Sequence, residues 1–344
     1  MRIMVTGDLG YIGSVLVPKS IERGHEVVGL DVGYFKDCNL TNDSNGYKRI
    51  TCDLRDVVKS HFDGIDAVIH LGGLSNDPLG ELSPNITYEI NHRATVKFAE
   101  IAKSAGVKRF VYSSSQSMYG VSDSDAELDE YNSEKNPVTA YAAAKWSAEQ
   151  ALNKLNDEKF SVVSFRPSTV FGASPRLRTD IVFNNLVACA FTTGFIEIKS
   201  DGTPWRPIVH VQDVCQAFLA GVEAPKTLIS GKAFNVGVKN GNYTVRQIAE
   251  AAARACPGAE LTFTGEHSDP RTYKVCFDRI HNELAEHFKP EWDLEKGGNE
   301  LMRFFEDINF TEDMFRGRQT VRLAQITHLI DEGLIDSNLR FIGD

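Results

Sequence analysis

The sequence lacks any long apolar run, since no stretch approaches the roughly 18 apolar residues of a membrane span. Its first residues show no basic region followed by an apolar segment, so no secretory signal is expected. The six cysteines form no CxxC pair and no metal-ligand spacing. This predicts free thiols, no metal site and a cytoplasmic location. No period of about 20 to 50 residues repeats, which excludes a solenoid.

Positive charge is also scarce. The chain has 37 Lys and Arg against 47 Asp and Glu, a formal net charge of −10 over 344 residues. An acidic chain without a basic block is poorly suited to hold a nucleic-acid backbone, so neither nucleic acid nor membrane is expected as a partner. An anionic ligand must instead be held by a few arginines and by helix N-termini.

Short apolar runs alternate with helical stretches through the first half, which predicts an α/β fold with a parallel sheet covered by helices on both faces. We expect strands at 2–6, 26–31, 47–52, 67–71, 109–114 and 161–166, and helices at 11–23, 85–105, 138–156 and 315–333. The length suits about two domains. We assign 1–167 with 207–236 to a cofactor domain, and 168–206 with 237–344 to a smaller C-terminal substrate domain.

A glycine-rich turn, TGDLGYIG at 6–13, follows the first expected strand and opens the first helix. The glycines permit a tight turn and let the backbone approach a pyrophosphate on the helix N-terminus. The alternative is a glycine turn that serves packing only. The residues expected to contact a dinucleotide here are Gly7, Leu9, Gly10, Tyr11, Ile12 and Gly13.

Asp31 ends the second strand, 18 residues after Gly13. A carboxylate there can accept both ribose hydroxyls of NAD and repels the 2′-phosphate of NADP, so NAD is the predicted cofactor. Asp53 and Leu54 follow the third strand and are expected at the adenine edge. A helix N-cap explains Asp53 nearly as well.

Two clusters suggest the chemistry. Three serines, 113–115, follow the fifth strand, and Tyr141 stands 26 residues after Ser115. Lys145 is one helical turn beyond Tyr141, so the phenol and the ammonium share a face. The ammonium, helped by the charge of an oxidised nicotinamide, favours the phenolate and lowers the tyrosine pKa. Tyr141 can then take a proton from a carbinol, while Ser115 hydrogen-bonds the same oxygen.

Together, TGDLGYIG, Asp31, VIHLGG, FVYSSSQSMYG and YAAAK resemble the extended short-chain dehydrogenase/reductase family, in particular its nucleotide-sugar epimerase/dehydratase branch of the UDP-galactose 4-epimerase type. The resemblance runs from residue 1 to about 280. It implies a doubly wound Rossmann domain, a nucleotide-diphosphate sugar as substrate, a homodimer, and Ser115, Tyr141 and Lys145 as the catalytic set. It also implies cofactor contacts from Leu71, Gly72, Gly73, Asn91, Ser113, Tyr141, Lys145, Pro167 and Ser168.

Departures from the family pattern narrow the reaction. The 4,6-dehydratases carry Asp-Glu after the catalytic hydroxyl residue, whereas this chain carries Gln116 and Ser117, which do not ionise. Decarboxylating members place Glu at the Ser117 position, and 3,5-epimerases need an extra acid/base pair. Oxidation and reduction at sugar C4 remain, as a 4-epimerase or as a 4-dehydrogenase or 4-keto reductase. A non-catalytic NAD-sensing or scaffold protein is a third possibility.

The resemblance also indicates the substrate site. Arg206, in WRPIVHV, stands where the family has the arginine that grips the nucleotide diphosphate, and Arg271 looks like the second family arginine. Two guanidinium forks on one diphosphate form a sensible clamp in an acidic protein. Arg176 and Arg178 add two cations near that site or are surface charges. The remaining residues implied for the substrate are Ser75, Ser115, Gln116, Tyr141, Asn184, Asn185 and Thr169, the last replacing the usual Asn.

Overall fold

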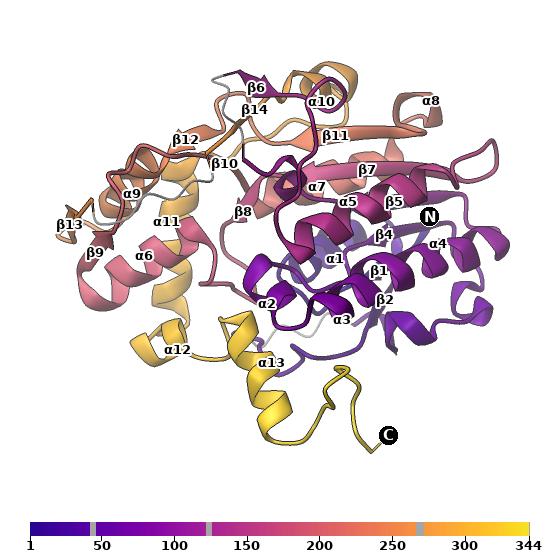
Figure 1. Ribbon diagram of the computed structural model, residues 1–344, viewed down its shortest axis with the longest axis horizontal. Helices are drawn as coiled ribbons and strands as arrows, with labels where there is room; N and C mark the ends of the chain where they lie inside the picture. Colours follow the sequence, from indigo (N-terminus) through magenta and orange to yellow (C-terminus); the bar gives the residue numbers. More distant parts are fainter. Residues whose placement is uncertain (42–45, 122–125, 266–271, 344) are drawn as a thin grey trace.

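The computed structural model describes residues 1–41, 46–121, 126–265 and 272–343. Its central sheet has seven strands in the order β11-β7-β5-β4-β1-β2-β3, and every neighbouring pair is parallel (Figure 1). The strands are β1 (Arg2–Thr6), β2 (Glu26–Asp31), β3 (Lys48–Thr51), β4 (Ala67–His70), β5 (Arg109–Ser113), β7 (Ser161–Pro167) and β11 (Lys232–Val236). The chain winds outward in both directions from β1, which confirms the doubly wound α/β prediction.

The six strands expected from the sequence lie within one residue of their predicted bounds. Their apolar runs are continuous because both faces of the sheet are covered. All seven residues of β7 and all four of β4 are buried. Strands of this kind occur in parallel sheets that have helices on both sides.

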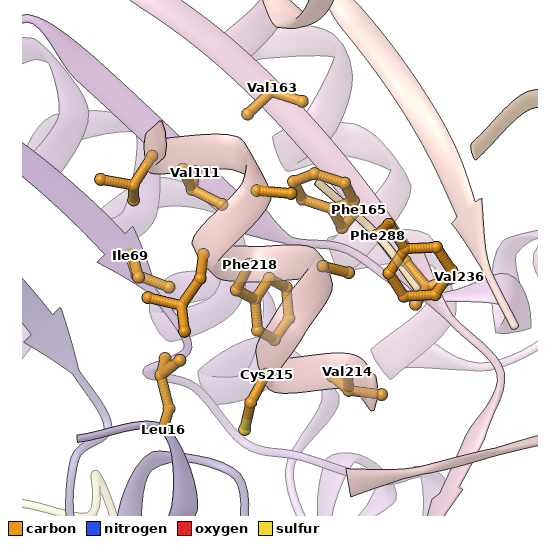
Figure 2. Close-up of a cluster of buried hydrophobic side chains, with 14 of the residues drawn as sticks. Leu16, Ile69, Val111, Val163, Phe165, Val214, Cys215, Phe218, Val236 and Phe288 are labelled. Atoms are coloured by element: carbon orange, nitrogen blue, oxygen red, sulfur yellow. The ribbon is translucent and has the colours of Figure 1, made fainter. Parts of the chain in front are cut away.

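Helices cover both faces of the sheet. On one face lie α1 (Gly13–Glu22) and α7 (Val211–Glu223), and on the other lie α4 (Thr95–Ser104) and α5 (Ala140–Asn153). Figure 2 shows Phe218 of α7 packed among apolar side chains of the sheet, including Phe165. Burying one such side chain stabilises the fold by about 1.5–3 kcal/mol.

Two predicted helices are divided in the structure. The stretch 85–105 is α3 (Pro84–Tyr88), a π-helical segment (Glu89–Ala94) and then α4. The stretch 315–333 contains the end of α12 (Glu312–Arg316) and then α13 (Arg322–Asp331), so one continuous helix was the wrong prediction. The break follows Gly317, where the Thr320 hydroxyl satisfies the Met314 carbonyl at 2.6 Å in place of a further helical turn.

A second lobe lies beside the sheet, on the left of Figure 1. Its strands form two small sheets, and its helices enclose an apolar cluster of their own. The strands are β8 (Thr169–Phe171), β9 (Phe195–Ile198), β10 (Trp205–His210), β12 (Asn242–Thr244) and β13 (Glu260–Phe263), and the main helices are α6 (Val182–Thr193), α9 (Val245–Ala255) and α11 (Leu294–Asp307).

The two-domain division stays a prediction, and two features of the structure run across it. β10, assigned in part to the cofactor domain, pairs with β8 and β12 rather than with the large sheet. α13, assigned to the substrate domain, packs against Tyr34 and Ile90 of the N-terminal half. Within the described residues, no helix is both long and apolar enough to cross a membrane.

Short elements complete the described chain. They are η1 (Leu54–Asp56), η2 (Lys59–Phe62), α2 (Asp77–Glu81), η4 (Gln116–Tyr119), β6 (Glu127–Leu128), α8 (Lys226–Ile229), β14 (Lys274–Val275) and α10 (Asp278–Glu283).

Candidate active site

A cavity of about 320 Å³ runs along the carboxyl ends of the central strands. Open α/β sheets bind ligands at this edge, where the strand order reverses. The predicted residues that line it are Gly7, Gly10, Tyr11, Ile12, Gly13, Asp31, Asp53, Leu54, Leu71, Gly72, Gly73, Ser75, Ser113, Ser115, Gln116, Tyr141, Lys145, Pro167, Ser168 and Thr169. The structure therefore brings together most of the residues expected at the cofactor and around the catalytic tyrosine.

The glycine turn has the shape that a dinucleotide diphosphate requires. Gly7 has φ +72°, and a Cβ on Gly13 would lie 2.1 Å from the Gly7 carbonyl oxygen, so both positions need glycine. The first turn of α1 has no side-chain cap, and the N–H groups of Ser14, Val15 and Leu16 donate to the carbonyls of Gly10 and Ile12. The turn thus fits a dinucleotide cofactor.

Asp31 is fixed at the end of β2 by two backbone donors. Its carboxylate accepts from the N–H of Gly33 at 2.7 Å and from that of Leu9 at 3.3 Å. Leu9 does not line the cavity, and its N–H helps to fix the Asp31 carboxylate. Burial, together with the nearby charge of Asp8, raises the pKa of Asp31 to about 6.

Asp53 forms the helix N-cap, and its place at the adenine edge stays a prediction. Its carboxylate caps η1 by accepting from the Arg55 N–H at 2.8 Å, and its side chain also lines the cavity. The Arg55 guanidinium pairs with it at 2.6 Å. Desolvation opposes ionisation, but the hydrogen bonds and charge of Arg55 prevail and lower the pKa of Asp53.

The catalytic candidates meet at the other end of the cavity. Lys145 Nζ donates to the Ser113 carbonyl at 2.8 Å and lies 6.0 Å from the centre of the Tyr141 ring. Ser115 Oγ accepts from the Ser117 N–H at 3.1 Å. Thr139 caps α5 by accepting from the Ala142 N–H at 3.2 Å, which places Tyr141 in the first turn of the helix.

The protein's own groups do not lower the Tyr141 pKa as predicted. Burial raises that pKa to about 12, and a hydrogen bond with Ser115 opposes the rise. Burial also lowers the pKa of Lys145 to about 8, and the amine is bound to a carbonyl rather than to the phenol. The sequence analysis also expects the positive charge of an oxidised nicotinamide to lower the Tyr141 pKa.

Glu149 is a part of the site that the sequence analysis missed. It lies one turn beyond Lys145 on α5 and accepts from the Ser114 hydroxyl at 2.5 Å. Arg166 on β7 pairs with the same carboxylate at 2.5 Å, and both side chains are buried. The spacing of Tyr141, Lys145 and Glu149, each four residues apart, is the signal that could have revealed it.

Gln116 is held as part of the cavity wall. Its amide nitrogen donates to the Arg166 carbonyl at 3.0 Å, and its oxygen accepts from the Ser168 hydroxyl at 3.1 Å. Ser117 receives a hydrogen bond from the Ser115 hydroxyl at 3.0 Å. The two positions after Ser115 therefore offer neither an acid nor a base.

Several predicted residues support the cavity from behind. Asn91 bonds both backbone groups of Leu74 at 2.8 Å. Asn184 donates to the Arg178 carbonyl at 2.9 Å, and Asn185 donates to the Thr179 carbonyl at 2.8 Å. Their amides hold backbone in place.

The predicted arginine clamp is not assembled in the described residues. Arg206 does not line the cavity, and its guanidinium donates to the Trp205 carbonyl at 2.8 Å. Arg271 lies outside the described residues. The clamp stays a prediction.

The two arginines that the sequence left open as surface charges are buried. Arg176 donates to backbone carbonyls of Phe35 and Lys36. Arg178 lines the cavity, pairs with Asp180 at 2.8 Å and donates to Ser75 at 3.3 Å. Other lining residues that carried no sequence signal are Tyr34, Phe35, Leu74, Asn76, Asp77, Tyr273 and Arg322.

The chain is similar to known proteins over most of its length. The chain is 30% identical over 337 residues to a UDP-glucose 4-epimerase of Bacillus subtilis, covering 88% of this chain and 94% of the relative. It is also 27% identical to a dTDP-D-glucose 4,6-dehydratase of Mus musculus, covering 92% and 88%. Similarity alone therefore does not separate the two reactions.

Solved structures share the fold. The UDP-glucose 4-epimerase of Thermotoga maritima, solved with UDP-glucose, superposes with a TM-score of 0.76 at 22% identity, covering 89% of this chain and 99% of that one. The UDP-glucuronic acid 4-epimerase of Bacillus cereus, solved with UDP-glucuronic acid and NAD, gives 0.75 at 21% identity, covering 90% and 100%. The family model described as the NAD dependent epimerase/dehydratase family matches residues 3–237, and the chain belongs to this family.

Proposed function

We propose that the protein is an NAD-dependent nucleotide-sugar 4-epimerase that acts by transient oxidation at sugar C4. The observation that carries this proposal is the combination at the end of β5. Ser115, Tyr141 and Lys145 line one end of the cavity, while Gln116 and Ser117 offer no group that ionises. Dehydration or decarboxylation of the family type would need an acid or a base at those two positions.

Each residue of the site is assigned one role in the reaction. When bound, NAD supplies the hydride acceptor and, on return, the hydride donor. Tyr141 takes the proton of the C4 hydroxyl and returns it to the epimerised oxygen. Ser115 hydrogen-bonds the same oxygen, and Lys145 holds the carbonyl of Ser113 so that the serine segment stays opposite Tyr141. Gln116 and Ser168 form a neutral wall beside them.

The relatives support a nucleotide-diphosphate sugar as substrate, since UDP-glucose 4-epimerases are among them. The base and the sugar are identified by incubating the protein with NAD and a panel of UDP-, GDP-, CDP- and dTDP-sugars, followed by NMR of the products. The 4-epimer of one sugar is expected. A dehydrated 4-keto sugar as the product, or no conversion of any sugar, would contradict the proposal.

Net cofactor turnover separates an epimerase from a 4-dehydrogenase or 4-keto reductase. An epimerase shows no net change of absorbance in the reduced-nicotinamide band, whereas the other two change it in proportion to product. A cytoplasmic location and a homodimer stay predictions of the same proposal.

A further inference from the structure

The C-terminal part of the chain returns to the end of the cavity where Asp31 lies. α13 begins with Arg322, whose side chain lines the cavity although only 1% of the residue is exposed. The chain then continues to contact Tyr34 and Arg55 on the N-terminal half (Figure 1, yellow). This segment lies outside the residues matched by the family model, which end at 237.

Arg322 sits where a cation is costly. Its guanidinium donates to the Arg176 carbonyl at 2.7 Å and to the Gln319 carbonyl at 3.4 Å, and it lies 4.6 Å above the Phe35 ring. Among the residues that the structure describes, no carboxylate forms an ion pair with it. Burial, and then the like charge of Arg178, lower the pKa of Arg322 to about 10.

The position of Arg322 on its helix adds to that cost. It is the first residue of α13, at the end of the helix dipole that carries partial positive charge. The first turn of α13 has no acidic residue of its own, but the Asp180 carboxylate accepts from the Arg322 backbone N–H and also pairs with Arg178. This one carboxylate therefore faces two buried guanidinium groups. A buried cation in this setting is unfavourable unless an anion compensates it. The cavity that Arg322 lines is where such an anion can enter.

The neighbours of Arg322 locate that anion. Arg178 influences the pKa of both Tyr11, in the glycine turn, and Tyr141, so its charge lies within reach of both. Arg176 similarly influences the pKa of Asp31.

Arg322 donates to the carbonyl of Arg176, whose own side chain bonds the Phe35 carbonyl. The Arg176 N–H donates to Ser174, whose hydroxyl donates to the Tyr11 carbonyl, so Arg322 lies against a loop that joins the glycine turn to the segment after Asp31. A dinucleotide whose ribose meets Asp31 and whose nicotinamide meets Tyr141 has its diphosphate between these two residues, at the glycine turn.

We propose that Arg322 binds the diphosphate of NAD, and that the C-terminal segment 322–343 encloses the adenosine half of the cofactor. The proposal depends on NAD binding and not on which sugar reaction the protein performs. It assigns to the C-terminal segment a part of the cofactor site that the Rossmann half does not supply.

The enclosure is built from contacts to residues that line the cavity. The Tyr34 hydroxyl donates to the Leu339 carbonyl, and its ring stacks on Phe341 at 5.7 Å. Arg340 pairs with Asp53 at 3.6 Å and also with Asp56. An apolar cluster joins the segment to the cavity wall, and its buried members are Tyr34, Leu74, Leu79, Ile90, Ile326, Leu329, Ile335 and Leu339. Release of the adenosine half requires some of these contacts to break.

Binding measurements test the role of Arg322. Calorimetric titration with NAD, ADP-ribose and UDP compares the unaltered protein with Arg322→Gln. Loss of a charge-assisted contact should weaken NAD and ADP-ribose by roughly ten- to a hundredfold. UDP should bind as before. Unchanged NAD affinity, or weakening of UDP alone, would overturn the proposal, the latter by assigning Arg322 to the substrate diphosphate.

Thermal melts separate ligand binding from a purely structural role. Without ligand, Arg322→Gln should be as stable as the unaltered protein or more stable, because a buried charge that shares its one nearby carboxylate, Asp180, with Arg178 is removed. The increase in Tm produced by NAD should shrink. A structural role predicts the reverse pattern, a less stable protein with an undiminished NAD shift. Arg322→Lys, which keeps the charge without the fork, should fall between the two proteins in NAD affinity.

Release kinetics test the enclosure. Arg340 does not itself line the cavity, and Arg340→Ala removes its ion pairs to Asp53 and Asp56. The variant should speed NAD dissociation severalfold in competition experiments. Arg316→Ala is the matched control, since Arg316 is exposed on α12 and pairs only locally with Glu312. Equal dissociation rates for Arg340→Ala and the control would overturn the enclosure.

Discussion

The two ends of the cavity are built in different ways. At the catalytic end, Lys145 and Glu149 of α5 hold the serine segment, with hydrogen bonds of 2.8 and 2.5 Å that span at most 35 positions of sequence. At the adenosine end, Tyr34 is bonded to Leu339, 305 positions away. The catalytic end is held by a helix that lies close in sequence to the serine segment, and the adenosine end is held by the last part of the chain.

The ion pair that holds the catalytic end also differs from the one that ties the C-terminal segment to Asp53. The side chains of Arg166 and Glu149 are 3% and 6% exposed, whereas Arg340 is 37% exposed. Breaking a buried pair leaves an uncompensated charge, but an exposed pair contributes only about 0–1 kcal/mol. The catalytic end is therefore the rigid end, and the adenosine end is the one suited to opening for cofactor exchange.

The largest effect is expected at the catalytic end, from Tyr141→Phe. Without the phenolic proton carrier, kcat should fall by about 10²- to 10⁴-fold. NAD affinity should be nearly unchanged, because phenylalanine keeps the ring that lines the cavity and only the hydroxyl is lost. Steady-state kinetics on an identified sugar, with calorimetry for NAD, decide the outcome. Near-full activity of the variant would remove Tyr141 as the base.

Glu149→Ala should have the next largest effect, because it leaves Arg166 buried without its partner. The free energy of unfolding should fall by about 3–5 kcal/mol, and kcat should fall as the Ser114 contact is lost. Gln150→Ala, on the exposed side of the same helix, is the control. Denaturant titration measures the stabilities. Equal midpoints for the two variants would show that the catalytic end is not held by this pair.

Local patterns predicted the sheet and the grouping of Ser115, Tyr141 and Lys145 along one cavity, because the physics that forms them is local. The spacing of Tyr141 and Lys145 depends only on helical geometry, and Asp31 depends only on the end of one strand. Arg322 and Tyr34 carry no such signal, because their meeting depends on how the whole chain packs.

The assignment of Asn184 and Asn185 to the substrate depends on similarity to a family segment and stays a prediction. Asn184 and Asn185 match such a segment, yet their amides hold backbone carbonyls rather than line the cavity.

Arg206→Ala tests the predicted arginine clamp. Arg206 lies in the second lobe, outside both the catalytic and the adenosine end of the cavity. If the guanidinium grips the nucleotide diphosphate, KM should rise by roughly one to two decades, with NAD affinity unchanged. Arg206→Lys should recover only part, because an ammonium keeps the charge but loses the bidentate fork. A variant with unchanged KM and unchanged Tm would remove Arg206 from the substrate site.

The adenosine end should respond to acid through Asp31, whose pKa is about 6. As pH falls below that value the carboxyl gains a proton and loses an acceptor for the ribose hydroxyls. The Kd for NAD should then rise, approaching about tenfold for each further pH unit. UDP binding supplies the control. Asp31→Asn should bind NAD weakly with little dependence on pH between 5 and 7, and a pH profile like that of the unaltered protein would show that another group titrates.

The smallest effect, and the sharpest test of independence between the two ends, is expected from Thr139→Ala. Thr139 caps α5 and donates to the Asp77 carboxylate at 2.7 Å, so its hydroxyl fixes the first turn, which carries Tyr141. Loss of an N-cap costs about 1 kcal/mol, and kcat should fall only a few-fold as the tyrosine becomes less ordered. Thr139→Ser keeps the hydroxyl and should restore both. NAD release should be the same in all three proteins, because no contact of Thr139 reaches Tyr34 or Arg340 among the described residues. Faster NAD release from Thr139→Ala would mean that the rigid catalytic end also governs how the adenosine end opens.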